Sequence, residues 1–232
     1  MSHSSTDQPS STLLRSVGVT DVARALTLLE ELPGLASQWC PLISLVADPD
    51  QALLQAVRLN EAAPGALASA VEQGGRALER LVAVLGGSRA LGDVVIAHPQ
   101  MVHRVWNTHP HPARALLEAV GADPEALIPV AAPGKTPDDV RRAYRSVILG
   151  IAADDLTCED PPTLVPEVTQ RLADVADGAL QASLALARRD IDPTGRVRLA
   201  VIAMGKTGAQ ELNYVSDVDV IFVVAPGEST TS

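Results

Sequence analysis

The chain has 232 residues, a net charge of −10 and a hydrophobic fraction of 47%, which is enough to fold one large or two modest domains. Only 2% of its residues are aromatic, so the core must be built from Leu, Val and Ala, which favours packed helices. Tight nucleic-acid binders usually present a basic face and stacking aromatics, so no nucleic acid is expected as a partner. No apolar run approaches the roughly 20 residues that span a bilayer, and no export signal is evident, so we expect a cytoplasmic protein without membrane contact.

Composition divides the chain into three predicted regions. Residues 1–16 are rich in Ser, Thr and Pro and predict a flexible tail. Residues 17–190 are dominated by helical periodicity, and residues 191–232 change character to an α/β segment. The isolated Cys40 and Cys158 predict reduced thiols.

Helix signals recur through the middle region. Caps are expected at Thr20-Asp21, Asp48-Pro49 and Ser88, and a break or kink at Gly74-Gly75. The run Thr136-Pro137-Asp138-Asp139 predicts the start of a helix that reaches about Asp155, ended by Pro161-Pro162. A long amphipathic helix is predicted from Leu164 to about Arg189.

Two clusters in this region admit a functional and a structural interpretation. Four histidines between His98 and Pro112 could hold a metal, but His-Pro dipeptides restrict the backbone and no carboxylate or Cys completes a ligand set. Arg141, Arg142 and Arg145 share a helix face that could meet an anion, although a solvated or salt-bridged face is the favoured interpretation.

The α/β segment carries the candidate chemistry. Residues 198–204 and 218–224 predict two strands with a turn and short helix between them. In an extended chain Asp217 and Asp219 would point the same way, about 6.6 Å apart at their Cα atoms, whereas Val218 would enter apolar packing. Two neighbouring carboxylates are costly without a cation, so Mg²⁺ shared with substrate phosphates is the expected occupant.

Upstream, Gly205-Lys206-Thr207-Gly208 follows the first predicted strand. Glycines let backbone amides approach a phosphate, and Lys206 adds a positive charge. The spacing is not that of a P-loop. Each half of the pattern is weak alone, but their order along the chain favours a phosphate and metal site.

The sequences AMGKTGAQELN (residues 203–213) and SDVDVIF (residues 216–222) resemble the polymerase-β-like nucleotidyltransferase motif. More narrowly, they are similar to the family of glutamine synthetase adenylyltransferase/adenylyl-removing enzymes. Weaker similarity covers residues 85–93, His98-Pro99 and the segment from Ile151 through the predicted long helix. The fold class implied is α+β: a mostly helical N-terminal region followed by the first strand–helix–strand of a truncated nucleotidyltransferase domain, residues 191–232.

The resemblance also implies functional roles. Asp217 and Asp219 would hold Mg²⁺, and Gly205, Lys206, Gly208 and Ser216 would bind phosphate or nucleotide. Members carry two catalytic halves: one removes AMP from a glutamine synthetase tyrosine by phosphorolysis, giving ADP, and the other attaches AMP from ATP. The chain resembles the opening of the adenylyl-removing half, so the expected partners are glutamine synthetase, nucleotide, phosphate and a PII-type signal protein.

Two departures from the family pattern concern the glycine-rich loop, where Thr207 replaces the usual leucine and Ala209 the second glycine. The family's third catalytic carboxylate lies on a later strand, beyond Ser232, so we expect the chain to be inactive alone. Another nucleotidyltransferase activity, such as uridylyl transfer, and a purely docking role for the helical region remain the alternatives.

Overall fold

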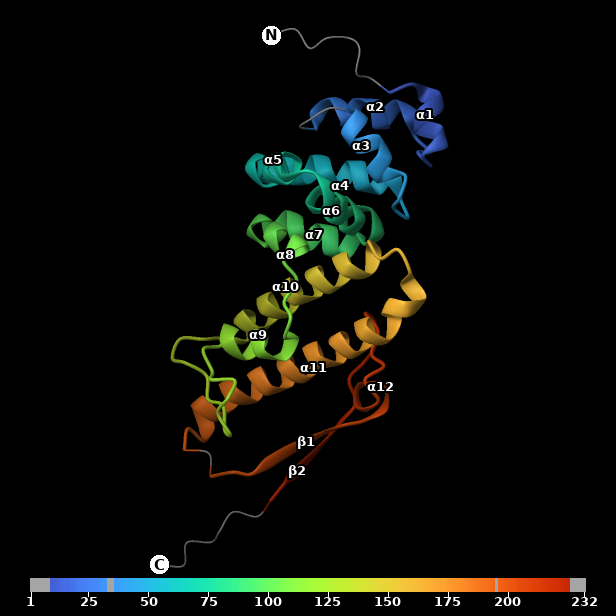
Figure 1. Cartoon of the computed structure of the whole chain (residues 1–232). Coiled ribbons are helices and arrows are strands. Elements are labelled where there is room, and N and C mark those ends of the chain that lie inside the picture. Colours follow the sequence, from blue (N-terminus) through green and yellow to red (C-terminus); the bar gives the residue numbers. More distant parts are fainter. Residues whose placement is uncertain (1–8, 33–35, 195, 226–232) are drawn as a thin grey trace, which may run out of the picture. The chain divides into compact units, whose positions relative to one another are not determined.

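A computed structural model describes residues 9–32, 36–194 and 196–225 (Figure 1). The chain forms two compact units, one of residues 1–108 and 152–159 and the other of residues 109–151 and 160–232. Within the described residues, no helix is both long and apolar enough to cross a membrane.

The first unit is built from helices. In chain order they are α1 (Ser11–Ser16), α2 (Val22–Glu31), α3 (Ala36–Ile43), α4 (Pro49–Ala62), α5 (Pro64–Gln73), α6 (Gly75–Gly87), α7 (Arg89–Ala97), the 3-10 turn η1 (Pro99–Met101), α8 (Val102–Trp106), and the last residues of α10 (Pro137–Leu156). Helix α4 packs against α5, α6 and α7, and its Leu53 and Leu59 are fully buried. The core is therefore made mainly of aliphatic side chains, as the composition predicts, with the buried Trp39 as its largest member.

The predicted helix starts in this unit are confirmed. The side chains of Asp21, Asp48 and Ser88 accept hydrogen bonds from backbone amides in the first turns of α2, α4 and α7. Gly74 separates α5 from α6, and its φ of 59° explains why a glycine stands at this break. Neither Cys40 nor Cys158 forms a disulfide in the described part of the chain, which agrees with the prediction of reduced thiols.

The predicted tail of residues 1–16 is wrong in its last six residues, which form α1. Ser10 caps this helix by accepting the Leu13 amide hydrogen at 3.1 Å, and the Leu14 side chain is fully buried. One buried leucine and one cap hold the helix, and neither stands out in a Ser-rich sequence. Residues 1–8 lie outside the described part of the chain.

A buried arginine ties three segments of the first unit together. Arg80 of α6 is 5% exposed, and its Nε donates to the Val105 carbonyl oxygen at 2.6 Å. Its two terminal nitrogens donate to the Asp154 carboxylate and the Thr108 hydroxyl. The guanidinium charge is thus neutralised and hydrogen-bonded inside the unit, as a buried charge requires.

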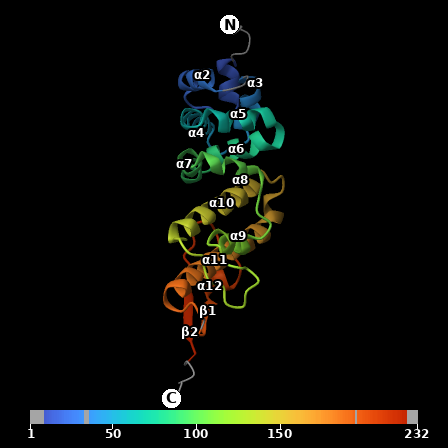
Figure 2. The ribbon, with the colours of Figure 1, turned by 90° about the vertical axis from the view of Figure 1, so that its left-hand side faces the viewer.

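The second unit contains α9 (Pro112–Ala119), most of α10, α11 (Pro161–Ile191), β1 (Leu199–Ala203), α12 (Gly205–Gly208) and β2 (Val220–Val224). Helix α9 lies along α11 in both ribbon views (Figures 1 and 2). The two backbones come so close that a Cβ atom on Gly178 would be 2.6 Å from the Ala113 Cα. Gly178 is therefore what permits this helix contact.

The two long helices, α10 and α11, begin with residues that are favoured in a first helical turn. Thr136 donates its amide and hydroxyl hydrogens to the Asp139 carboxylate at the start of α10, which confirms the predicted helix start. Pro161-Pro162 were predicted to end the preceding segment but instead form the first turn of α11. Proline is tolerated there because the amide it lacks would have no partner within the helix. The predicted start at Leu164 was three residues late.

The strands form a two-stranded antiparallel sheet. Leu199 pairs with Val224 and Ala203 with Val220, so the register runs over the full length of both strands. The architecture is α+β and mostly helical, as predicted. Both strands are shorter than predicted, and β2 starts two residues later, at Val220.

Candidate active site

The candidate site is built on the β1–β2 hairpin, which follows a turn at the end of α11. The Asp192 carboxylate, at the end of α11, accepts the Arg196 and Val197 amide hydrogens at 3.0 and 2.8 Å. These two backbone hydrogen bonds lower the pKa of Asp192. The ionised carboxylate therefore closes the turn that starts β1.

The ladder extends beyond the two strands and brings Asp219 to the glycine-rich loop. The Met204 amide donates to the Asp219 carbonyl oxygen at 2.9 Å. A Cβ atom on Gly205 would lie 3.4 Å from the Asp219 Oδ2, so this carboxylate borders the first residue of α12. Gly205 has a φ of 54°, a conformation that glycine adopts without strain. The structure thus joins two predicted site residues, Gly205 and Asp219.

Gly208 has a structural role. Its amide donates to the Met204 carbonyl oxygen at 3.0 Å. A Cβ atom here would lie 2.5 Å from the Ala203 carbonyl oxygen, so only glycine lets α12 fold back against β1. The predicted contact of Gly208 with phosphate stays a prediction.

Ser216 closes the turn that leads to the acidic pair. Its hydroxyl donates to the Asn213 Oδ1 at 2.8 Å and accepts the Asn213 amide hydrogen at 3.3 Å. The same Asn213 oxygen accepts the Val215 amide hydrogen at 3.1 Å. Asn213 was missed as a positioning residue, although an Asn followed three residues later by a Ser is a turn signal. Nucleotide binding by Ser216 stays a prediction.

The loop between the strands is anchored by two buried side chains. Leu212 and Thr207 are 3% and 4% exposed, and α12 contacts α11. The Lys206 carbonyl accepts the Glu211 amide hydrogen at 2.8 Å, while the Lys206 side chain is exposed. The buried pair fixes the loop, and Lys206 is left in solvent beside Gly205.

The carboxylates of Asp217 and Asp219 are available to bind a cation. Asp217 and Asp219 are exposed and precede β2, and within the described residues neither carboxylate has a hydrogen bond or an ion pair. Two unpaired carboxylates suit Mg²⁺, which needs few protein ligands when phosphate and water complete its shell. No group of three or more His, Cys, Asp or Glu side chains in the described part of the chain could hold a metal ion.

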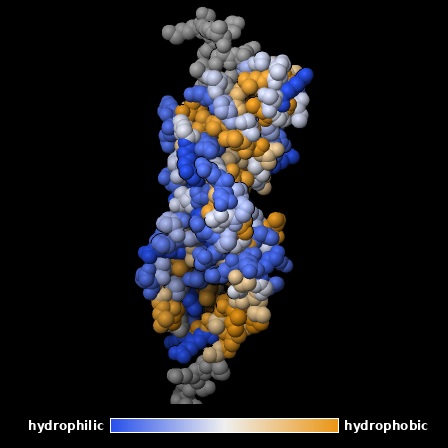
Figure 3. All heavy atoms as spheres, turned by 45° about the vertical axis from the view of Figure 1, so that its right-hand side comes forward, coloured by the Kyte–Doolittle hydropathy of each residue, from blue (hydrophilic) through white to orange (hydrophobic). Residues whose placement is uncertain are grey.

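The predicted burial of Val218 was wrong, because this side chain is 39% exposed. Helix α12 lies against β1, whereas four of the five residues of β2 are exposed, so Val218 precedes a strand that is largely open to solvent. Hydrophobic side chains gather on the surface near the strands (Figure 3). The exposed hydrophobic residues of β1 and β2 include Ile202, Ile221, Phe222, Val223 and Val224.

The arginine face on α10 is partly salt-bridged. Arg141 pairs with Asp138 and Arg142 with Asp139, each one helical turn away. This confirms the structural interpretation for these two arginines.

Comparison with known proteins places this hairpin in a family. A sequence model described as glutamate-ammonia ligase adenylyltransferase matches residues 78–232, which contain the whole hairpin. The chain belongs to the glutamate-ammonia ligase adenylyltransferase family. No solved structure matches the chain.

Relatives of this family are named bifunctional glutamine synthetase adenylyltransferase/adenylyl-removing enzymes. The protein of Bifidobacterium longum strain DJO10A is 38% identical over 97% of this chain and 23% of its own length. The protein of Cutibacterium acnes is 39% identical over 86% of this chain and 21% of its own, and that of Mycobacterium avium 43% over 82% and 20%. The chain thus spans about a quarter of the length of the curated relatives it matches.

Proposed function

We propose that this chain supplies the glycine-rich loop and two metal-binding carboxylates for removal of AMP from a tyrosine of glutamine synthetase. The observation that supports the proposal most is the approach of the Asp219 carboxylate to Gly205 at the two ends of the connection between β1 and β2. In the full-length protein this reaction is paired with ATP-dependent adenylylation.

The polar residues and the glycine in the connection between the two strands each have a role in the proposal. Asp217 and Asp219 hold Mg²⁺, which supplies charge stabilisation at the phosphoryl oxygens. Lys206, exposed beside Gly205, attracts the negatively charged phosphates. Asn213 and Ser216 hold the turn before Asp217, and Gly208 keeps α12 against β1.

The reaction is phosphorolysis. An oxygen of inorganic phosphate forms a bond to the phosphorus of the tyrosine-linked AMP, and the bond from that phosphorus to the tyrosine oxygen breaks. The tyrosine oxygen leaves with the bonding electron pair and takes up a proton, and the product is ADP. The carboxylates and Lys206 act by placing and neutralising charge, because the attacking oxygen already belongs to a substrate.

The test places this chain in the Bifidobacterium longum relative, in exchange for the matching segment. Adenylylated glutamine synthetase, phosphate and Mg²⁺ are supplied, and ADP release is measured. We expect phosphate-dependent ADP that falls more than about 100-fold in Asp217→Asn or Asp219→Asn, because metal-dependent charge stabilisation is lost. Asp190→Asn, an exposed residue paired with Arg189, is the matched control and should leave the rate unchanged.

The remaining outcomes separate the alternatives. Transfer of UMP in place of AMP would assign another nucleotidyltransferase activity. Retention of glutamine synthetase without any ADP would indicate a docking role. Unassisted turnover by residues 1–232 would contradict our expectation that the chain is inactive alone.

A further inference from the structure

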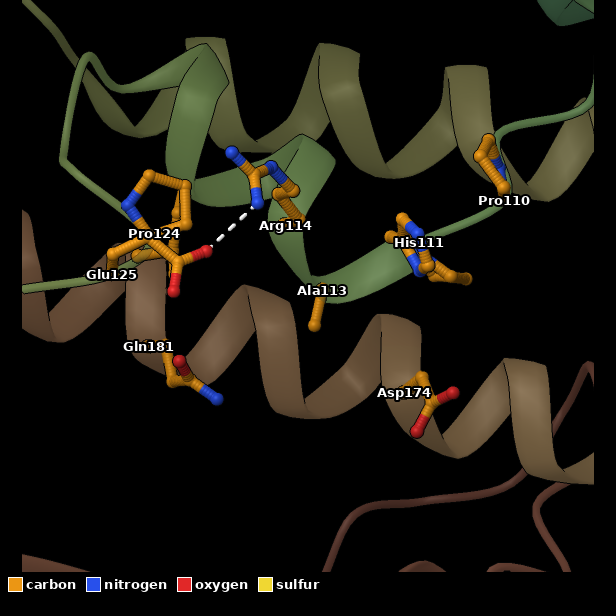
Figure 4. A pocket seen from close by; sticks show the side chains of 10 residues that line it. Pro110, His111, Ala113, Arg114, Pro124, Glu125, Asp174 and Gln181 are labelled. Atoms are coloured by element: carbon orange, nitrogen blue, oxygen red, sulfur yellow. Dashed lines mark hydrogen bonds and ion pairs between the residues drawn. The ribbon is translucent and has the colours of Figure 1, made fainter.

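A groove lies between α9 and α11, away from the hairpin strands and wholly inside the second unit. Its volume is about 440 Å³. The close contact of Gly178 with Ala113 joins the two helices that bound the groove. Asp174 and Gln181 come from α11, whereas His111, Arg114 and Glu125 come from α9 and its flanking segments (Figure 4).

The polar groups of the groove leave an excess of negative charge. Arg114 is already engaged, since it pairs with Glu118 and with Glu125 at 2.8 Å each. Asp174 has no hydrogen bond or ion pair among the residues that the structure describes. A cation entering the groove would therefore meet a free carboxylate, whereas an anion would find its only arginine occupied by two acids.

The Asp174 carboxylate is held at a cost to the fold. Partial burial raises its pKa, which means that the surroundings disfavour its charged form. At neutral pH such a group lowers the stability of the folded chain, because the folded state binds the proton more tightly than the unfolded state. An internal partner that would offset this cost is absent from the described residues.

Apolar side chains complete the groove. They are Pro110, Pro112, Ala113, Leu117 and Pro124. Lysine and arginine lay their methylene stems on apolar surface while keeping the charged end on a polar group. A groove lined by prolines and by an unpaired carboxylate therefore suits a long basic side chain better than a compact ion.

The length of the groove indicates an extended segment. Asp174 and Gln181 are seven residues apart on one helix, which corresponds to about 10 Å at 1.5 Å per residue. An extended peptide covers that distance with about three residues. One basic residue at Asp174 would thus leave its neighbours near the Gln181 amide.

We propose that the groove between α9 and α11 binds an extended segment of a partner protein through a basic side chain, whose cation pairs with Asp174. Docking at this groove is independent of adenylyl transfer at the hairpin, and loss of either activity leaves the other measurable.

The test uses an acetylated and amidated Ala-Ala-Arg-Ala peptide and its analogue with citrulline, which keeps the shape of arginine without the charge. Amide chemical shifts of the isotope-labelled 232-residue chain are followed during titration. We expect shifts concentrated in α9 and in residues 174–181, with affinity at least about tenfold weaker for the citrulline peptide.

Asp177 offers a matched control variant. It lies one turn from Asp174, its pKa is also raised by burial and by Asp174, and it does not line the groove. Asp174→Asn should lower the affinity for the arginine peptide at least about tenfold, whereas Asp177→Asn should change that affinity less than about twofold. Gln181→Leu should weaken binding without removing the preference for arginine over citrulline.

Stability provides a second readout. Asp174→Asn should unfold at higher urea concentration than the unsubstituted chain at neutral pH, since it removes a disfavoured charge. Equal weakening by Asp174→Asn and Asp177→Asn, or shifts spread over the whole acidic surface, would overturn the proposal. So would equal affinity for the arginine and citrulline peptides.

Discussion

Gly208 lies against the backbone of Ala203, and a Cβ atom on Gly208 would be 2.5 Å from the Ala203 carbonyl oxygen. Backbone atoms cannot move aside as a flexible side chain does, so α12 must shift if this glycine is replaced. The position of the loop is thus set by the absence of a side chain.

Gly208→Ala should displace α12 and destabilise the chain by about 1–3 kcal/mol, the usual cost of overpacking. Urea unfolding measures the loss, and amide shifts of Met204 and Gly205 report the displacement. Gly65→Ala is the control, because a Cβ atom there meets nothing within 4 Å in helix α5. It should be neutral or stabilising by up to about 1 kcal/mol, and equal loss in both variants would contradict the steric explanation.

Thr207→Val should stabilise the chain by about 1 kcal/mol, since the Thr207 hydroxyl oxygen is buried without a hydrogen-bond partner among the described residues. Thr157→Val is the comparison, because the Thr157 hydroxyl donates to the Ala153 carbonyl oxygen at 2.7 Å. Its removal should lower the free energy of unfolding. Thermal unfolding distinguishes them. A loss of stability in Thr207→Val would mean that its hydroxyl makes a useful interaction.

Arg80→Met should cost about 3–5 kcal/mol, because it leaves the Asp154 carboxylate without its buried partner. Arg58→Met breaks a pair with Asp93 whose side chains are 41% and 45% exposed, so it should cost much less than Arg80→Met. Urea unfolding of the two variants measures both values. Similar losses would show that burial does not set the strength of these pairs.

Asp50 should make the stability of the chain depend on pH. Partial burial favours a higher pKa, but hydrogen bonds from the Thr20 hydroxyl and the Thr20 and Asp21 amides outweigh it and lower the pKa below the ordinary 3.8. Its contribution is therefore complete above that value and is lost as pH falls through the folded pKa. Asp50→Ala should lose about 1–2 kcal/mol near neutral pH.

The pH dependence checks this assignment. The difference between Asp50→Ala and the unsubstituted chain should shrink when urea unfolding is repeated at about pH 3. A difference that stays constant with pH would mean that the Asp50 charge contributes nothing.

Local signals in the sequence predicted much of the fold. Caps such as Asp48 and Ser88, and the break at Gly74, act through bonds and dihedral angles within a few residues, so a pattern can reveal them. Helices α1 and α9 were missed because they are short and depend on burial of a few leucines against other helices, α2 for α1 and the distant α11 for α9.

The candidate site also has a part that the sequence predicted and a part that it did not. The order of Gly205, Lys206, Asp217 and Asp219 along the chain suggested phosphate and metal chemistry without a structure. The contact between Gly205 and Asp219 could not be read from the sequence, because it depends on the register of an antiparallel pair. The free carboxylate of Asp174 was also invisible, since its surroundings come from α9, some sixty residues earlier.

The exposed hairpin has a practical consequence for work with the isolated chain. Each of its strands has one unpaired side in the described residues, and apolar side chains such as Phe222 stand in water. Open strand edges of this kind recruit further strands from any available molecule. Concentrated solutions should therefore form oligomers through cross-strand pairing, and Phe222→Lys should keep the chain monomeric without altering its helices.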